Sequence, residues 1–194
     1  MYLYNSLKIV ANVIFNLIYK IKIVNKENIP IQGKFILCSN HIHVLDPVLL
    51  AAFIPRQISW MGKKELFENK IIAYFLNKLG VFPVDRNEPD LSTIKNSIRI
   101  LKSENVLGIF PEGTRVKEMN LENAKAGIAL ISIKSKSPVL PIYIEGNYKP
   151  FSKLKIYVGD PIDFSHSYDK KLTTADYKEF SKEILKSIYS NKSK

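Results

Sequence analysis

The chain has 194 residues, of which 46% are hydrophobic and 24% are charged. This composition excludes an intrinsically disordered protein and predicts one domain with a full-sized core. The formal net charge of +11 indicates an anionic partner, such as phospholipid headgroups, a phosphorylated substrate or nucleic acid, unless the lysines only form a solvated surface.

Residues 3–21 are predicted to form an amphipathic helix, because polar residues recur there every three or four positions and apolar residues fill the rest. Its longest uncharged run, 9–19, is too short and too polar to span a bilayer, and its start lacks the positive region of a signal peptide. We expect this helix to lie in the headgroup region of a membrane; the alternative is packing on the protein's own core.

The rest of the chain alternates apolar runs with helical patterns, which predicts an α/β fold with a mixed, largely parallel sheet flanked by helices. A single cysteine, Cys38, excludes an internal disulfide and is expected to lie in the core of the first strand. The predicted strands are 35–38, 57–61, 81–84, 106–110, 139–144 and 154–158, and the predicted helices are 46–54, 71–79, 91–101, 123–135 and 174–189.

The turn after the first strand carries His41 and, five positions on, Asp46, which with Pro47 suits the start of a helix. A tight turn would fold the carboxylate back onto the imidazole, so that the second ring nitrogen could take a proton from an alcohol. No serine or cysteine nucleophile is placed to use such a pair, so the alcohol would belong to a substrate. The alternative is that Asp46 caps a helix and His41 is an ordinary turn histidine.

Two further strand ends carry polar clusters, Asp85-Arg86 and Glu112-Gly113-Thr114-Arg115. The planar guanidinium of arginine suits bidentate contact with a phosphate, and a glycine lets backbone N–H groups approach an anion closely. The alternative for each arginine is a surface ion pair.

Four segments resemble, in order, the motifs of the glycerolipid acyltransferase superfamily, and specifically of the 1-acylglycerol-3-phosphate acyltransferases. The resemblance covers roughly residues 25–160, and 63–66 and 125–127 look like the family's intervening segments. The chain departs from the pattern at His43, where the family often has serine, and at 116–119, which lacks the serine or glycine common after the third motif. The four segments are Asn40-His41-Ile42-His43-Val44-Leu45-Asp46, Gly80-Val81-Phe82-Pro83-Val84-Asp85-Arg86, Phe110-Pro111-Glu112-Gly113-Thr114-Arg115 and Val139-Leu140-Pro141-Ile142.

The resemblance implies a 1-acyl-sn-glycerol-3-phosphate O-acyltransferase. His41, oriented by Asp46, would take the proton from the sn-2 hydroxyl of lysophosphatidic acid, and the alkoxide would attack an acyl thioester. Glu112 would organise its loop rather than contact the phosphate. The residues implied in holding the acceptor phosphate are Arg86, Gly113, Thr114, Arg115 and Lys63.

The same resemblance implies no cofactor and no metal, with acyl-CoA or acyl carrier protein supplying the acyl group as a co-substrate. The partners are then lysophosphatidic acid and an anionic bilayer, and the expected location is peripheral, on the cytoplasmic face of the cell membrane. Residues 1–24 are assigned to the membrane-contact helix and 25–194 to the acyltransferase catalytic domain.

Three alternatives stay open. Another acceptor within the superfamily, such as glycerol-3-phosphate or another lysolipid, would use the same residues. A metal hydrolase could use His41, His43 and Asp46 as ligands, but His166 is the only other histidine and no ligand cluster is recognisable. A nucleic-acid-binding module would explain the charge, but no helix-turn-helix, zinc-finger or aromatic RNA-binding signature is visible.

Overall fold

The computed structural model describes residues 2–85, 91–116 and 118–193. Within them, seven strands form one sheet in the order β1-β7-β6-β2-β5-β3-β4, and every neighbouring pair is parallel except β6 and β7. The predicted mixed, largely parallel sheet is therefore confirmed. The strands are β1 Lys20–Val24, β2 Phe35–Ser39, β3 Ile58–Lys63, β4 Phe82–Val84, β5 Val106–Ile109, β6 Val139–Gly146 and β7 Lys153–Val158.

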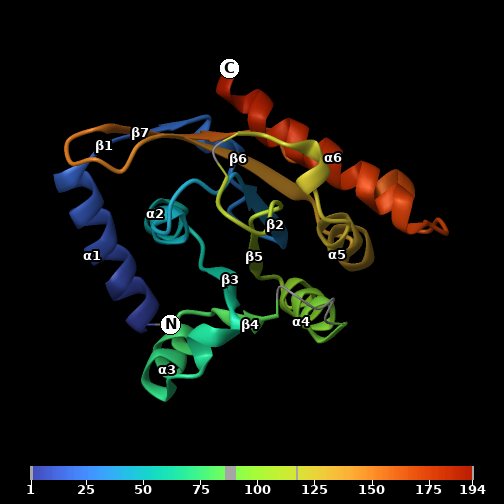
Figure 1. The fold of residues 1–194 in the computed structure, drawn as a ribbon, viewed down its shortest axis with the longest axis horizontal. Coiled ribbons are helices and arrows are strands. Elements are labelled where there is room, and N and C mark those ends of the chain that lie inside the picture. The colour runs from blue at the N-terminus through green and yellow to red at the C-terminus, as the bar shows by residue number, and fades with distance from the viewer. Residues whose placement is uncertain (1, 86–90, 117, 194) are drawn as a thin grey trace.

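Helices cover both faces of this sheet. In Figure 1, α1 and α2 lie on one side of it and α4, α5 and α6 on the other, while α3 lies beside β4. Short 3₁₀ turns connect several elements. The helices are α1 Tyr2–Ile18, α2 Asp46–Phe53, α3 Lys70–Lys78, α4 Leu91–Lys102, α5 Gly127–Ser135 and α6 Thr174–Ser190, and the 3₁₀ turns are η1 Lys26–Asn28, η2 Lys64–Phe67, η3 Leu121–Asn123, η4 Ser165–Ser167 and η5 Asn191–Ser193.

The central strand β2 is buried on both faces, as its uninterrupted apolar run predicts. Phe35 and Leu37 belong to the core under α1 and α2, whereas Ile36 and Cys38 belong to the core under α4, α5 and α6. Side chains alternate between the two faces of a strand, so this one run feeds both cores. Cys38 is fully buried, as expected.

The first helix is shorter than predicted. α1 ends at Ile18, and residues 20–24 form β1, an edge strand that pairs in parallel with β7. The prediction of helix through residue 21 was therefore wrong, and the last five residues of the segment 1–24 are strand. Lys20-Ile21-Lys22-Ile23-Val24 alternates charged and β-branched residues with period two, which is the pattern of a half-exposed strand.

The middle of the polar stripe of α1, at Lys8 and Asn12, faces the protein, whereas Asn5 and Asn16 of the same stripe are exposed. The Nζ atom of Lys8 donates a hydrogen bond to the carbonyl of Ile54, and Nδ2 of Asn12 donates to the carbonyl of Ala52 at 3.3 Å. Both carbonyls lie at the C-terminal end of α2, where the helix itself leaves carbonyl groups without partners. The outward side of α1 is apolar instead: Ile9 is 64% exposed and Leu17 is 73% exposed.

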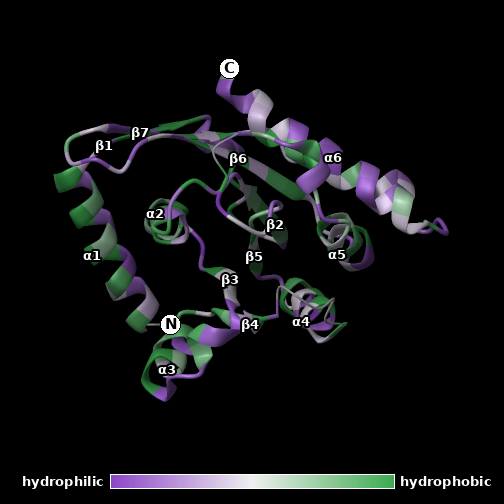
Figure 2. Cartoon of the chain, viewed as in Figure 1, coloured by the Kyte–Doolittle hydropathy of each residue, from purple (hydrophilic) through white to green (hydrophobic). Residues whose placement is uncertain are grey.

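Figure 2 shows this contrast along the chain, with hydrophobic residues along most of α1 and alternating hydrophilic and hydrophobic residues along α6. None of the helices in the described part of the chain has the length and apolar character needed to cross a membrane.

Candidate active site

His41 and Asp46 lie at the carboxyl end of β2, on the turn that leads into α2. Nδ1 of His41 is 2.8 Å from Oδ2 of Asp46, so the contact expected from the sequence is present. The same Oδ2 accepts hydrogen bonds from the backbone N–H groups of Ile42 and His43, both at 2.7 Å. The carboxylate is fully buried, while the His41 side chain is 12% exposed. The tight turn thus wraps the carboxylate in donors and leaves the imidazole within reach of a ligand.

This hydrogen bond fixes which nitrogen of His41 carries the proton. A carboxylate is an acceptor, so Nδ1 of the neutral ring donates to Asp46 and Nε2 is left with a free lone pair. An imidazole held in this way accepts a proton at Nε2, and the adjacent negative charge stabilises the imidazolium that forms.

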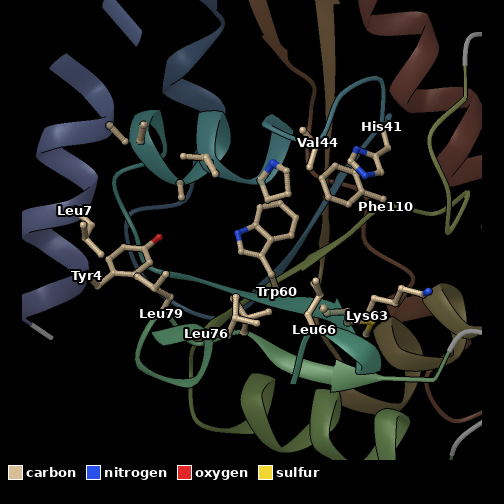
Figure 3. A pocket seen from close by; sticks show the side chains of 18 of the residues that line it. Tyr4, Leu7, His41, Val44, Trp60, Lys63, Leu66, Leu76, Leu79 and Phe110 are labelled. Carbon is tan, nitrogen blue, oxygen red and sulfur yellow. The ribbon is translucent and has the colours of Figure 1, made fainter. Parts of the chain in front are cut away.

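Aromatic rings hold the imidazole in place from one side. The His41 ring stacks on Phe110 with centroids 4.0 Å apart, and Phe110 stacks on Trp60 at 5.1 Å. The indole lies flat against β5 because position 108 is glycine: a Cβ atom there would collide with the ring of Trp60. Gly108 therefore determines how close to β5 the stacked rings of Trp60, Phe110 and His41 can lie. Figure 3 shows the His41, Phe110 and Trp60 rings one after another along the pocket.

Asn40, the residue before His41, locks the end of β2 to β6. Its side-chain Nδ2 donates to the carbonyl of Ile144 at 2.9 Å, and its Oδ1 accepts from the N–H of the same residue at 2.7 Å. The amide side chain thereby continues the β2–β6 hydrogen-bond ladder where the backbone turns away. Asn40 is buried, and this pairing fixes the point from which His41 projects.

Tyr148, which follows β6, also reaches the pair. Its hydroxyl donates to Oδ1 of Asp46 at 2.6 Å, and its ring stacks on His43 with centroids 4.1 Å apart. Sequence analysis missed this residue. Tyr148 lies just beyond the carboxyl end of a strand that neighbours β2, and no local sequence pattern carries that neighbourhood.

An elongated cavity of about 490 Å³ starts at His41 and runs between α1, α2, β3 and α3 (Figure 3). Most of its lining is apolar, and Lys63 and Arg115 line it as well. Lys8 also lines it, and burial lowers the pKa of its amine. The apolar lining includes Leu7, Val44, Val48, Trp60, Leu66, Leu76 and Leu79.

The loop after β5 brings the third motif to the same place. The backbone N–H of Val116 donates to the carbonyl of His41 at 2.9 Å, which ties the loop to the turn that carries His41 and Asp46. Gly113 has a φ of +67°, a conformation that favours glycine. Thr114 and Arg115 are exposed to solvent. Lys125, which sequence analysis did not include in the site, reaches over this loop: its Cε atom lies 3.4 Å from the position of a Cβ on Gly113.

The side chain of Glu112 does not face the exposed part of the loop, where Thr114 and Arg115 lie. Only 3% of the residue is exposed, and its Oε1 accepts a hydrogen bond from the Tyr189 hydroxyl at 2.8 Å. Burial raises the pKa of Glu112, and the Tyr189 hydroxyl and the nearby His41 oppose that rise. A carboxyl group in this position joins the loop to α6, in keeping with a loop-organising role.

The remaining site candidates have different surroundings. Lys63 is half-exposed and lies 3.0 Å from the carboxylate of Glu65 in a solvent-accessible ion pair. Arg86 lies outside the described residues. His43 stacks on Tyr148, and its Nδ1 accepts from the backbone N–H of Leu45 at 3.3 Å. Across residues 2–85, 91–116 and 118–193, no three His, Cys, Asp or Glu side chains gather as a set of metal ligands.

Comparison with known proteins finds a matching family and related enzymes. Residues 20–145 match the protein family described as Acyltransferase. The 1-acyl-sn-glycerol-3-phosphate acyltransferase of Bacillus subtilis is 38% identical over 183 residues, which span 88% of this chain and 87% of that protein. The Streptococcus pneumoniae protein of the same name is 36% identical over 73% of this chain and 55% of its own length.

A solved structure shares the fold. The crystal structure of the 1-acyl-sn-glycerophosphate (LPA) acyltransferase PlsC from Thermotoga maritima matches with a TM-score of 0.77 at 22% identity, over 99% of this chain and 79% of that one.

Proposed function

The chain belongs to the acyltransferase family, and we propose that it transfers a fatty acyl group from a thioester to the sn-2 hydroxyl of 1-acyl-sn-glycerol-3-phosphate, giving phosphatidic acid. The observation that carries this proposal is the hydrogen-bonded His41–Asp46 pair at the end of an apolar cavity that Arg115 and Lys63 also line. One site thus offers a base, a cationic surface and space for an acyl chain.

In the proposed reaction, Nε2 of His41 accepts the proton of the sn-2 hydroxyl as its oxygen attacks the thioester carbonyl. A C–O bond forms, the C–S bond breaks, and the imidazolium returns its proton to the departing thiolate. Asp46 holds the ring through Nδ1 and stabilises its charged form. No acyl-enzyme is required, and no cofactor enters beyond the thioester co-substrate, acyl-CoA or acyl carrier protein.

The acceptor phosphate is proposed to bind over the loop after β5. Arg115 supplies a planar pair of donors, and the left-handed Gly113 exposes backbone at the loop surface. Lys63, which lines the cavity with Arg115, and Lys125, which lies against Gly113, add positive charge. Thr114 adds a hydroxyl, and Arg86 remains a candidate from the sequence. Glu112 is kept out of contact because its carboxyl group is buried against Tyr189.

The fatty acyl chain is proposed to lie in the apolar part of the cavity, between α1, α2 and α3. Burying each methylene group contributes about 0.8 kcal/mol, so the apolar part of the cavity supplies most of the affinity for a long acyl chain.

We also propose that α1 rests on a membrane at its cytoplasmic face. The outward side of this helix is largely apolar, and two of its polar side chains, Lys8 and Asn12, are used on the carbonyl groups of α2. Apolar side chains on the outer side of a helix are unfavourably exposed to water. The headgroup region of a bilayer gives them a favourable contact. The net charge of +11 adds attraction to anionic lipid.

The test is a transfer assay with purified protein, several thioester donors and a panel of acceptors: lysophosphatidic acid, glycerol-3-phosphate and other lysolipids. We expect phosphatidic acid from lysophosphatidic acid, and a fall in kcat of about 10²–10⁴-fold in His41→Ala. His166→Ala is the matched control, because this exposed histidine lies beside Phe164 and Phe180, away from the cavity. Transfer to glycerol-3-phosphate alone would refute the acceptor, and undiminished transfer by His41→Ala would refute the base.

A further inference from the structure

We propose that Tyr148 is a positioning residue of the active site, whose hydroxyl holds the Asp46 carboxylate in the orientation that keeps His41 ready to accept a proton. This inference rests on the proposed function of the His41–Asp46 pair. It adds a third side chain to that pair, from a segment more than a hundred residues away in the sequence.

The two carboxylate oxygens of Asp46 have different tasks. Oδ2 accepts from Nδ1 of His41 and from two backbone N–H groups of the turn. Oδ1 accepts from the Tyr148 hydroxyl at 2.6 Å, a short bond of the kind formed with a charged acceptor. The local turn therefore secures one oxygen, and Tyr148 secures the other and prevents rotation of the carboxylate about its Cβ–Cγ bond.

Tyr148 is itself held on two sides. Its ring stacks on His43, at an interplanar angle of 17°, and meets the ring of Tyr19 edge-on, with centroids 5.8 Å apart. The Tyr19 hydroxyl also donates to the Tyr148 carbonyl at 3.4 Å. Burial and the negative charge of Asp46 raise the pKa of Tyr148, so the phenol stays a neutral donor.

The hydroxyl also tunes how strongly the pair holds a proton. A donor on Oδ1 withdraws negative charge from the carboxylate and so weakens its hold on the imidazolium. Without that donor, a fully buried oxygen loses its partner, and the pair binds a proton more tightly. The other titratable or charged groups around the pair are His43, Glu112, Lys8, Lys63 and Arg115. Tyr148→Phe removes none of these side chains and keeps the ring on which His43 stacks.

The experiment is the pH dependence of kcat/KM for Tyr148→Phe, with Tyr168→Phe as the matched control. Tyr168 also donates to a carboxylate at 2.6 Å, that of Asp163, and Asp163 adjoins Ile162, which pairs with Val139 at the opposite end of β6 from Tyr148. We expect kcat/KM to fall about 10- to 100-fold in Tyr148→Phe, and its acidic limb to move up by about one pH unit. The KM for the acyl acceptor should change little. Tyr168→Phe should match the wild type.

Two further proteins make the result decisive. A fluorotyrosine placed at position 148 is a stronger donor of the same shape, and it should move the acidic limb to lower pH. Asp46→Asn should lose about 10³-fold or more in kcat on its own. Absence of transfer by the wild type would refute the proposed function, and normal activity in Asp46→Asn would refute the role of the His41–Asp46 pair. An inactive Asp46→Asn beside an unmoved acidic limb in both position-148 proteins would overturn the role of Tyr148 alone.

Discussion

Asn40→Ala tests how the site is anchored, because Asn40 joins the turn that carries His41 and Asp46 to the sheet. Its side chain makes two hydrogen bonds with the backbone of Ile144, one as donor at 2.9 Å and one as acceptor at 2.7 Å. Asn40 is 1% exposed and Ile144 is 1% exposed, so bulk water does not reach the groups that the substitution would leave unpaired.

The magnitude follows from those two groups. A buried backbone N–H or carbonyl that loses its partner costs about 1–3 kcal/mol, so the pair costs about 2–6 kcal/mol. For a chain of this length, each kcal/mol lowers Tm by roughly 2–4 °C. The middle of the range, about 4 kcal/mol, predicts a fall in Tm of roughly 8–16 °C. Because His41 follows directly in the chain, its displacement should also lower kcat by about 10- to 100-fold.

Urea unfolding and thermal melts measure the first effect, and the transfer assay measures the second. Asn191→Ala is the control: Asn191 is also buried, but it donates one hydrogen bond, to the Pro141 carbonyl at 3.2 Å, at a distance along β6 from the turn that carries His41 and Asp46. It should lose less stability than Asn40→Ala, because the Pro141 carbonyl keeps its hydrogen bond from the Gly159 N–H at 2.8 Å, and its kcat should not change. A loss below about 1 kcal/mol in Asn40→Ala, or an unchanged kcat, would refute the anchoring role, since unpaired buried groups cost at least that much.

Three other variants test separate parts of the protein. Arg115→Ala should raise the KM for the acceptor about 10-fold or more and leave the KM for the thioester nearly unchanged, because a charge-assisted bond to phosphate is lost; equal rises in both KM values would contradict the phosphate role. Gly108→Ala should cost about 1–3 kcal/mol in urea unfolding, because its methyl group displaces Trp60, and a neutral effect would show that the stack does not depend on this glycine. Replacing both Ile9 and Val13 by serine should weaken cosedimentation with anionic vesicles about 10-fold at unchanged Tm, since both are exposed; equal vesicle binding would remove α1 from the membrane contact.

The parts of the fold that depend on local patterns could be predicted from the sequence. β2 was identified because a central parallel strand is apolar at every position, and the contact between His41 and Asp46 was identified because a five-residue turn determines it. β1 was not, since its alternating residues follow the helix without a proline or glycine between them.

Contacts that depend on strand order could not be predicted in this way. Tyr148 meets Asp46 only because β6 lies next to β2, and no local pattern encodes that adjacency. The periodicity of α1 separated its polar and apolar sides correctly but did not say which side faces the protein. That answer depends on the end of α2, whose carbonyl groups attract Lys8 and Asn12.

The stack of rings beside His41 gives this protein an internal optical reporter. Trp60 is the only tryptophan in the chain, and it lines the cavity one ring away from the imidazole. Its indole N–H has no hydrogen-bond partner within the described residues. Tryptophan fluorescence, excited at the red edge of the protein absorption spectrum, therefore comes from one position. An acyl chain that enters the cavity changes the polarity around this indole, so its entry can be followed without an added label.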